Sequence, residues 1–400
     1  MTSRIILLLA LTLINSACAS RNIMFNQSTL PAPALNTTRL FMDWDGELYP
    51  SVDMSNFDRR EHKASLAFFF AQAKEEHATE WAALGRAYGL GNGNFENEWN
   101  TAQDSIIERT VRQITGMNTQ DPIVVLIHGY NNEAGAATTV FDSVRSALRN
   151  VRELGRNPSF IDIYWDGRTD LGSKLRNMSA WNHAQHNAYS VGLTLRRILN
   201  RLPHDRPVRI LTHSHGAKVA SVALWNVASS LDYDVTPQWM NWYKGALVNT
   251  VTYRRPSHPD LRLGMIVPAM PGNVISDINP AKSRIAPVPG MLPARIVIGR
   301  NVHDLAVGKH FFGLGGIINS AWGGSTTLGA RPGEFEKHDD DWNQPGQAQT
   351  AFCVDFSHTN VTPREHSWTT YMAREAIGEF LELLFSDDTE LPTQYRCSGT

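Results

Sequence analysis

Ser214 is the residue of this chain whose surroundings are most typical of chemistry. It lies in residues 209–217, RILTHSHGA, where a short apolar run leads into a serine flanked by two histidines. This layout is typical of a sharp strand-to-helix turn that presents a nucleophilic serine. Such a turn needs small residues two positions before and after the serine. Gly216 meets this requirement, whereas Thr212 stands where glycine is commoner, and a buried serine at an ordinary strand end is the alternative.

A second motif lies upstream, in residues 121–132, DPIVVLIHGYNN. Its β-branched run predicts a fully buried strand. A His-Gly pair after such a strand can begin an oxyanion hole, in which backbone N–H groups bind the negative charge that develops on a carbonyl oxygen during acyl transfer. We expect these donors to be the N–H of Tyr130 or Asn131 and that of His215. The alternative is an ordinary turn, because asparagine and glycine favour turns.

Together these motifs resemble a known family. HGYNN after the first long strand, YWDG at residues 164–167 and HSHG at residues 213–216 are similar to the bacterial esterase/lipase-like α/β-hydrolases. The resemblance spans residues 115–385, with insertions. It implies an α/β-hydrolase fold with a mainly parallel sheet, helices on both faces, and a Ser–Asp–His triad in that chain order. It implies no particular substrate.

The acid of such a triad should follow a strand downstream of Ser214. Residues 295–300, RIVIGR, predict a strand, and Asp304 comes shortly after it. There it could orient and stabilise a protonated histidine. Asp277 is the competing acid, although it lies further from the end of its predicted strand at 263–268. Helix N-capping would also explain Asp304.

The base should lie in a loop after the last strand, which we predict at residues 352–356. Two histidines follow this strand, His358 and His366. His366 precedes an amphipathic helix predicted to run through Phe385, and it matches the family's pattern of a histidine before the last helix. We therefore favour His366, with His358, close to the strand end, as the alternative.

The order Ser214, Asp304, His366 predicts a serine hydrolase. His366 would take the proton of Ser214, which would attack an ester carbonyl and form an acyl-enzyme that water then hydrolyses. This chemistry needs no metal and no organic cofactor. The run HDDD at residues 338–341 lacks metal-site spacing, and we expect a solvated loop there with at most weak calcium binding.

The first residues predict export to the cell envelope. Arg4 precedes an apolar run at residues 5–14 that is too short to cross a bilayer as a mature helix, and small residues lead to Cys18. We expect residues 1–18 to be a signal peptide. Ser-Ala-Cys also resembles the bacterial lipobox, which implies a lipidated Cys18, anchored by the sorting pattern in the outer membrane. Plain signal-peptidase cleavage is the alternative, because an asparagine stands where the lipobox prefers an aliphatic residue.

The chain has three cysteines, and lipidation of Cys18 would leave Cys353 and Cys397. In an oxidising compartment these two can form a disulfide. The bridge would attach the C-terminal tail, residues 386–400, to the last predicted strand, next to the loop that carries His366. Two unpaired cysteines are the alternative.

Composition and the order of elements fit an α/β enzyme. The 400 residues carry a net charge of −2, so the electrostatic pattern of a nucleic-acid-binding protein is missing. Strands alternate with helices from residue 122 to residue 230, which predicts a parallel sheet. The expected strands are 122–128, 159–165 and 207–212, and the expected helices are 134–151, 180–201 and 215–230.

Around this core we expect a linker at 19–40, an N-terminal extension at 41–115 that packs on the core, and a hydrolase domain at 116–385. The extension should hold a strand and turn at 41–46 and helices at 64–87 and 105–114. Two insertions, at about 232–259 and 311–350, should roof the active site. An aromatic cluster at residues 239–244 could line the pocket or touch a lipid interface, and ordinary packing is the alternative.

Three functions remain open from the sequence. The first is a membrane-anchored serine hydrolase that cleaves small-molecule or lipid esters. The second is a weakly active or inactive hydrolase-fold envelope lipoprotein that acts in binding or assembly. The third is amide or peptide hydrolysis by the same triad. Substrate and oligomeric state do not follow from the sequence.

Overall fold

The structure is a computed structural model of the chain. It describes residues 30–50, 66, 78–91, 95–117, 120–130, 132–167, 174–225, 258–270, 272, 293–304, 306–307, 328–330, 350–357, 366–388, 395 and 397. The predicted signal peptide with Cys18, most of the two predicted insertions, including the aromatic cluster at 239–244, and the acidic run at 338–341 lie outside these residues.

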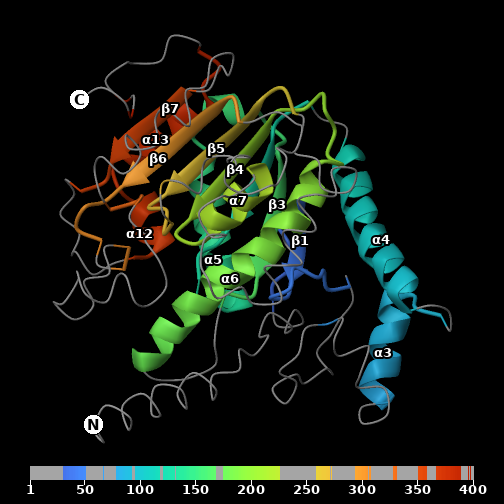
Figure 1. The fold of residues 1–400 in the computed structure, drawn as a ribbon. Coiled ribbons are helices and arrows are strands. Elements are labelled where there is room, and N and C mark those ends of the chain that lie inside the picture. Colours follow the sequence, from blue (N-terminus) through green and yellow to red (C-terminus); the bar gives the residue numbers. More distant parts are fainter. Residues whose placement is uncertain are drawn as a thin grey trace, which may run out of the picture.

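In the described part of the chain, seven strands form one parallel sheet (Figure 1). The strands are β1 Thr37–Met42, β2 Ile123–Ile127, β3 Ser159–Trp165, β4 Val208–His213, β5 Leu261–Ile266, β6 Arg295–Arg300 and β7 Thr350–Asp355. Their order is β1-β3-β2-β4-β5-β6-β7, and every neighbouring pair is parallel. The α/β class predicted from the sequence is therefore confirmed, and all carboxyl ends meet at one edge of the sheet.

Helices fill most of the connections between the strands. They are α3 Ala78–Tyr88, α4 Phe95–Thr115, α5 Ala134–Leu148, α6 Lys174–Leu199, α7 Gly216–Leu224, α12 Trp368–Met372 and α13 Ile377–Phe385, with a short 3₁₀ turn η1 at Arg152–Leu154. Among the residues that the structure describes, no helix combines the length and the apolar character needed to cross a bilayer.

The helices cover both faces of the sheet (Figure 1). On one face, Arg145 of α5 donates to Asp162 of β3 at 2.7 Å. Asp162 is aligned across the sheet with Leu126 of β2, Leu211 of β4 and Gly264 of β5, so all four residues face the same side. A Cβ atom at Gly264 would lie 2.8 Å from Leu384 of α13. Helices α5 and α13 therefore pack on the same face. Helices α6 and α7 pack against each other on the opposite face. Strand β2, IVVLI, is thus buried at every residue, which explains its unbroken apolar sequence.

Strand β1 corrects one predicted boundary. Residues 37–42 pair in parallel with β3 throughout, so the sheet begins inside the segment expected to be a linker at 19–40. The sequence TTRLFM, with β-branched and large apolar residues, suits a strand. Phe41 stacks on Tyr164 with ring centroids 4.4 Å apart, which adds side-chain packing to the ladder. The first part of the predicted extension at 41–115 accordingly belongs to the sheet itself.

The described helix α4 of that region is bonded to the core of strands and helices. Gln103 of α4 accepts a hydrogen bond from the Leu48 N–H at 2.7 Å and donates to the Leu48 carbonyl at 3.1 Å. Asp104 accepts from Arg197 and Arg201 at 2.9 and 2.7 Å, which ties α4 to α6 and its C-terminal end. Helix α4 is longer than the predicted 105–114. Helix α3 falls at the end of the predicted 64–87, and most of the earlier residues of that range lie outside the described part of the chain.

The last predicted helix is interrupted. Instead of one helix through Phe385, α12 and α13 are separated by a turn at residues 373–376. The N–H groups of Ala373 and Arg374 bond to carbonyls three residues back, so the chain is wound more tightly there than an α-helix. The Arg374 guanidinium donates a hydrogen bond to the Phe356 carbonyl at 2.6 Å, which joins this turn to the end of β7.

Cys353 of β7 and Cys397 lie within disulfide distance, with Cα atoms 5.0 Å apart, which is the predicted pairing. The Cys397 N–H also donates to the Ala351 carbonyl at 3.2 Å. Cys397 is therefore placed against the strand that precedes His366 by a backbone hydrogen bond, at a distance that suits the disulfide.

Loss of this bridge should destabilise the fold. A cross-link over a sequence separation of 44 residues restricts the unfolded chain by roughly 4 kcal/mol in the loop-entropy relation. We expect Cys397→Ser to lower the free energy of unfolding by up to about that amount in urea titrations, and a reductant to have the same effect on the wild type but none on the variant. Two reactive thiols from Cys353 and Cys397 in the unreduced, denatured protein would contradict the bridge.

Candidate active site

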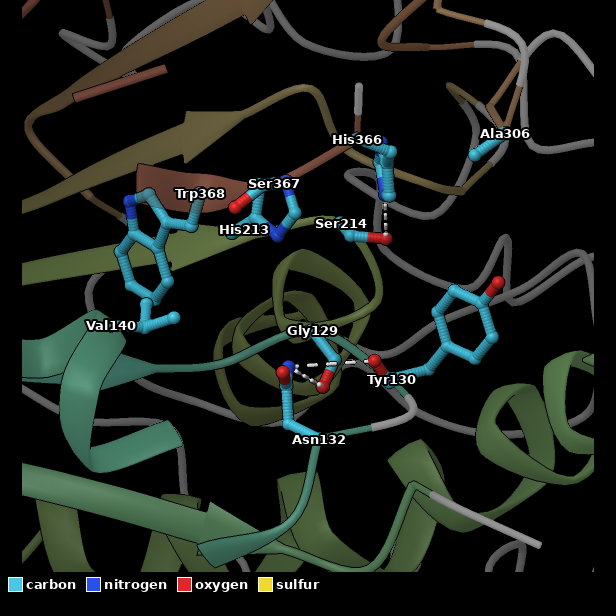
Figure 2. A pocket seen from close by; sticks show the side chains of 10 residues that line it. All are labelled: Gly129, Tyr130, Asn132, Val140, His213, Ser214, Ala306, His366, Ser367 and Trp368. Atoms are coloured by element: carbon cyan, nitrogen blue, oxygen red, sulfur yellow. Dashed lines mark hydrogen bonds between the residues drawn. The ribbon is translucent and has the colours of Figure 1, made fainter. Parts of the chain in front are cut away.

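Three side chains predicted from the sequence meet at the carboxyl edge of the sheet. Ser214 follows β4, Asp304 follows β6 and His366 follows β7. The Ser214 Oγ lies 2.8 Å from His366 Nε2, and His366 Nδ1 lies 2.7 Å from Asp304 Oδ2 (Figure 2 shows the first of these bonds). Ser214 and Asp304 are buried, and the His366 side chain is 14% exposed. The structure therefore joins the three residues in one hydrogen-bonded line.

The backbone at Ser214 has the shape expected of a strand-to-helix elbow. Its φ angle is +54°, in the left-handed region that a residue with a Cβ atom rarely adopts. The Ser214 carbonyl accepts from the N–H groups of Ala217 and Ala269, which helps to hold the turn. A Cβ atom at Gly216 would lie 2.5 Å from the Ile127 carbonyl oxygen, so only glycine fits where α7 starts against the end of β2.

Thr212 occupies its position in the elbow without a clash. Its side chain is buried, and its hydroxyl donates to the Gly264 carbonyl of β5 at 3.2 Å. The larger residue is thus bonded to the neighbouring strand. The departure from glycine that the sequence shows at this position is compatible with the positive φ of Ser214.

Asp304 is held as a buried carboxylate. Its Oδ1 accepts from the backbone N–H groups of Ala306 and Val307 at 2.9 and 3.0 Å, and its Oδ2 accepts from His366 and from the Tyr371 hydroxyl, each at 2.7 Å. Burial raises the pKa of Asp304, but the charge and hydrogen bond of His366, followed by the Tyr371 and Val307 bonds, lower it to about 2. Asp304 can therefore only accept hydrogen bonds at neutral pH.

This charge state fixes the tautomer of His366. Because Asp304 has no proton to give, the Nδ1 of His366 must carry one, and in the neutral ring Nε2 is then an acceptor for the Ser214 hydroxyl. The arrangement has the polarity that a general base requires.

His213 lies beside this line and stays uncharged. Its ring is buried, with its centroid 4.7 Å from that of His366 and stacked at 5.8 Å on Trp368. Burial, then the nearby charge of His366, lower the pKa of His213 well below its ordinary value. His213 therefore acts as an apolar-like wall of the site and does not compete with His366 for protons.

His128, the histidine of the His-Gly motif, has a structural role. Its Nε2 accepts from the Trp165 N–H at 3.1 Å, so its Nδ1 carries the proton and donates to the Gly129 carbonyl at 2.6 Å. The Trp165 indole N–H donates back to the His128 carbonyl at 2.8 Å. Burial outweighs the Gly129 bond and lowers the pKa of His128 to about 4, so the neutral form is stable.

These bonds orient the peptide group that follows. The Gly129 carbonyl oxygen is bound by His128 and by the Asn132 side-chain amide at 3.2 Å, on the side away from Ser214 (Figure 2). Because a peptide group is planar and trans, the Tyr130 N–H points in the opposite direction, toward Ser214. A Cβ atom at Gly129 would lie 3.0 Å from the Ser214 Cβ, so the glycine allows this close approach.

His215, the second predicted donor, lies next to Tyr130, the first. It follows Ser214 directly, is buried, and its ring packs edge-on against that of Tyr130 with centroids 5.5 Å apart. The remaining predicted residues, namely Asn131, the alternative acid Asp277 and the alternative base His358, lie outside the described residues.

Several residues of the site were not singled out from the sequence. Tyr371 and Asn301 contact the Asp304 carboxylate directly or through each other, and Trp165 and Asn132 hold the turn after β2. Asn132 and Trp165 both belong to motifs that the sequence shows. Asn132 bonds within its own turn, whereas Trp165, at the end of β3, bonds to His128 after β2. Tyr371 lies on α12, five residues after His366, and no local sequence pattern indicates that its hydroxyl reaches a carboxylate.

A cavity of about 350 Å³ borders Ser214. Its lining combines polar groups near the serine with apolar side chains at one end (Figure 2): Gly129, Tyr130, Asn132, Val140, His213, Ser214, Ala306, His366, Ser367 and Trp368. Within the described ranges, no group of three or more His, Cys, Asp or Glu side chains is arranged to hold a metal ion.

Comparison of the chain with protein-family models, with curated proteins and with solved structures finds no match. The assignment of the site consequently rests on its own geometry.

The close contact at Gly216 leads to a stability prediction. Gly216→Ala should lower the free energy of unfolding by about 1–3 kcal/mol, because its methyl group would collide with the backbone at the end of β2. Urea denaturation followed by circular dichroism measures this change. Gly378→Ala is the matched control in α13, because nothing lies within 4 Å of its Cβ position, and it should be neutral or stabilising. Equal stability of the two variants would contradict the elbow packing.

Proposed function

We propose that this protein is a serine hydrolase of the α/β-hydrolase fold that cleaves carboxylic esters, lipid esters included. The observation that carries the proposal is the line from Ser214 through His366 to the ionised Asp304, with distances of 2.8 and 2.7 Å. In the chain, the serine, acid and base follow β4, β6 and β7 in that order. This is the chain order of triads on α/β-hydrolase sheets.

The reaction follows from the protonation states. His366 Nε2 takes the Ser214 proton as Ser214 Oγ attacks the ester carbonyl, and Asp304 stabilises the positive charge that forms on the imidazole. His366 then gives that proton to the leaving alkoxide, which departs and leaves an acyl group on Ser214. In the second half, His366 takes a proton from water, the hydroxide attacks the acyl-enzyme, and Ser214 recovers its proton as the acid product leaves.

The charge on the tetrahedral oxygen needs donors that are already in place. The Tyr130 N–H is aimed toward Ser214 because His128 and Asn132 hold the opposite end of its peptide group. The N–H of His215, directly after the serine, supplies the second donor in such elbows. A fixed backbone donor of this kind contributes about 3–4 kcal/mol to an acyl transfer.

The positive φ of Ser214 favours this function over that of a non-catalytic lipoprotein. A left-handed serine costs on the order of 1–3 kcal/mol, and such strain is typical of sites where a side chain must be presented in one orientation. The polar and apolar lining of the adjoining cavity suits a carbonyl group with an apolar substituent. Amide hydrolysis uses the same groups, so ester and amide substrates are compared directly in the test.

Ser214→Ala should abolish covalent labelling by a fluorophosphonate and lower kcat/KM on soluble esters by about 10⁴-fold or more, because the nucleophile is removed. Intact-mass spectrometry of the labelled protein and ester assays measure the two effects. Ser221→Ala is the matched control, since that serine is buried in α7 and bonds to the Met270 sulfur. Labelling that survives Ser214→Ala, or a wild type that does not react, would contradict the serine-hydrolase proposal.

A panel of esters of different acyl length, phospholipids and peptides then identifies the bond that is cleaved. Ester cleavage with no detectable peptide cleavage is the expected outcome. Preferential peptide cleavage would contradict the ester assignment while leaving the nucleophile in place.

For the location we propose export to the cell envelope, with the protein anchored through a lipidated Cys18. The basic Arg4, the apolar residues 5–14 and the Ser-Ala-Cys sequence support this.

Cys18→Ala should therefore abolish incorporation of labelled palmitate and release the protein from the membrane fraction of expressing bacteria, because the acylated thiol is lost. Cys397→Ala is the control that keeps the label. Absence of label from the wild type would show plain cleavage instead of lipidation.

A further inference from the structure

Tyr371 is a buried tyrosine whose hydroxyl lies in the triad. It is fully buried on α12, and its hydroxyl donates to Asp304 Oδ2 at 2.7 Å. The same carboxylate oxygen accepts the Nδ1–H of His366. Tyr371 and His366 are therefore direct competitors for the charge on one oxygen atom.

Asn301 fixes the direction of the Tyr371 proton. The Asn301 side-chain N–H donates to the Tyr371 hydroxyl oxygen at 2.8 Å, so the tyrosine proton is directed to Asp304. The orientation of the Asn301 amide is set in turn, because its Oδ1 accepts the backbone N–H of His303 at 3.0 Å. The chain Asn301 to Tyr371 to Asp304 thus has a single consistent set of donors.

These bonds also connect two segments of the chain that are distant in sequence. His366 and Tyr371 belong to residues 366–372, whereas Asn301 and Asp304 belong to the loop after β6. The two segments are joined by the His366–Asp304 bond and by the Asn301–Tyr371 bond. The Arg374 guanidinium lies over the Tyr371 ring, 4.3 Å from its centroid, and fixes the ring from the other side.

We propose that Tyr371 is a positioning residue of the active site: held by Asn301, its hydroxyl fixes the Asp304 carboxylate against His366 and takes up part of its negative charge, which sets the pH at which Ser214 is activated. The inference rests on the proposed hydrolase function. It adds to the predicted Ser–Asp–His line a fourth side chain that touches neither substrate nor serine.

The sign of the pH effect follows from the groups around Asp304. His366 and Tyr371 contact it from the 366–372 segment, and His213 and Tyr130 face it from the ends of β4 and β2. His213 is neutral, and burial followed by the Asp304 charge raises the pKa of Tyr130 to about 12, so neither adds a charge at neutral pH. The Asp304–His366 pair must lose one proton before it can accept that of Ser214.

Removal of the Tyr371 hydroxyl leaves more negative charge on Asp304 Oδ2, and the pair then holds its proton more tightly. Activity increases with pH as this proton is lost. The midpoint of that increase should therefore lie at a higher pH in the variant. A purely structural role for the hydroxyl would lower activity equally at every pH.

The test is Tyr371→Phe compared with Tyr164→Phe. Tyr164 is an equally buried tyrosine that shares one hydroxyl hydrogen bond with Thr138 at 2.8 Å, away from the triad. For Tyr371→Phe we expect the midpoint of the rising limb of kcat/KM on a soluble ester to move up by about 0.5–1 pH unit, a loss of about 3–10-fold below the midpoint. For Tyr164→Phe we expect no movement of the midpoint. An unmoved midpoint in Tyr371→Phe would overturn the proposal.

Two further measurements keep the outcome decisive. If Tyr371→Phe does not fold, Asn301→Ala leaves the tyrosine in place but unheld, and the midpoint should move in the same direction by a smaller amount. The proton NMR signal of the His366 Nδ1–H, assigned by its loss in Asp304→Asn, reports the Asp304 contact without any turnover. It should shift in Tyr371→Phe and not in Tyr164→Phe, even if Ser214 proves unreactive; no shift would overturn the positioning role independently of the hydrolase proposal.

Discussion

The close packing of the Ser214 turn against the end of β2 is the constraint on which the site depends. Helix α7 starts so near the Ile127 carbonyl that Gly216 admits no side chain, and a Cβ atom at Gly129 would lie only 3.0 Å from that of Ser214. Ser214 has a left-handed backbone, and the turn after β2 lies beside it. The strand that leads into this turn, β4, is paired in parallel on both sides, with β2 and with β5.

Charge imposes the second constraint. A buried carboxylate is unfavourable unless hydrogen bonds replace its lost water. Asp304 meets this requirement with two backbone N–H groups, one imidazole and one tyrosine hydroxyl. Burial lowers the pKa values of two histidines near the serine, His128 and His213, so both are neutral. The separation of charged and neutral groups makes the direction of proton transfer unambiguous.

Much of the fold was predictable because its signals are local. Apolar runs ended by glycine or proline identify β2, and alternating strands and helices identify the parallel sheet. The start of β1 at Thr37 and the break between α12 and α13 were not predictable. Strand β1 forms where β3 offers a free edge, and the turn after α12 forms where Arg374 reaches the Phe356 carbonyl. Both depend on partners from elsewhere in the chain.

The sequence by itself determined the chemical types and their order, namely Ser214, Asp304 and His366, each after a strand, because parallel strands bring their carboxyl ends to one edge. Only the tertiary structure decided which atoms meet. It showed that His128 holds a peptide group, that Thr212 bonds to β5, and that Tyr371 and Asn301 support the acid. These contacts join residues far apart in the chain, and their distances and proton directions follow from packing, which no local pattern of residues encodes.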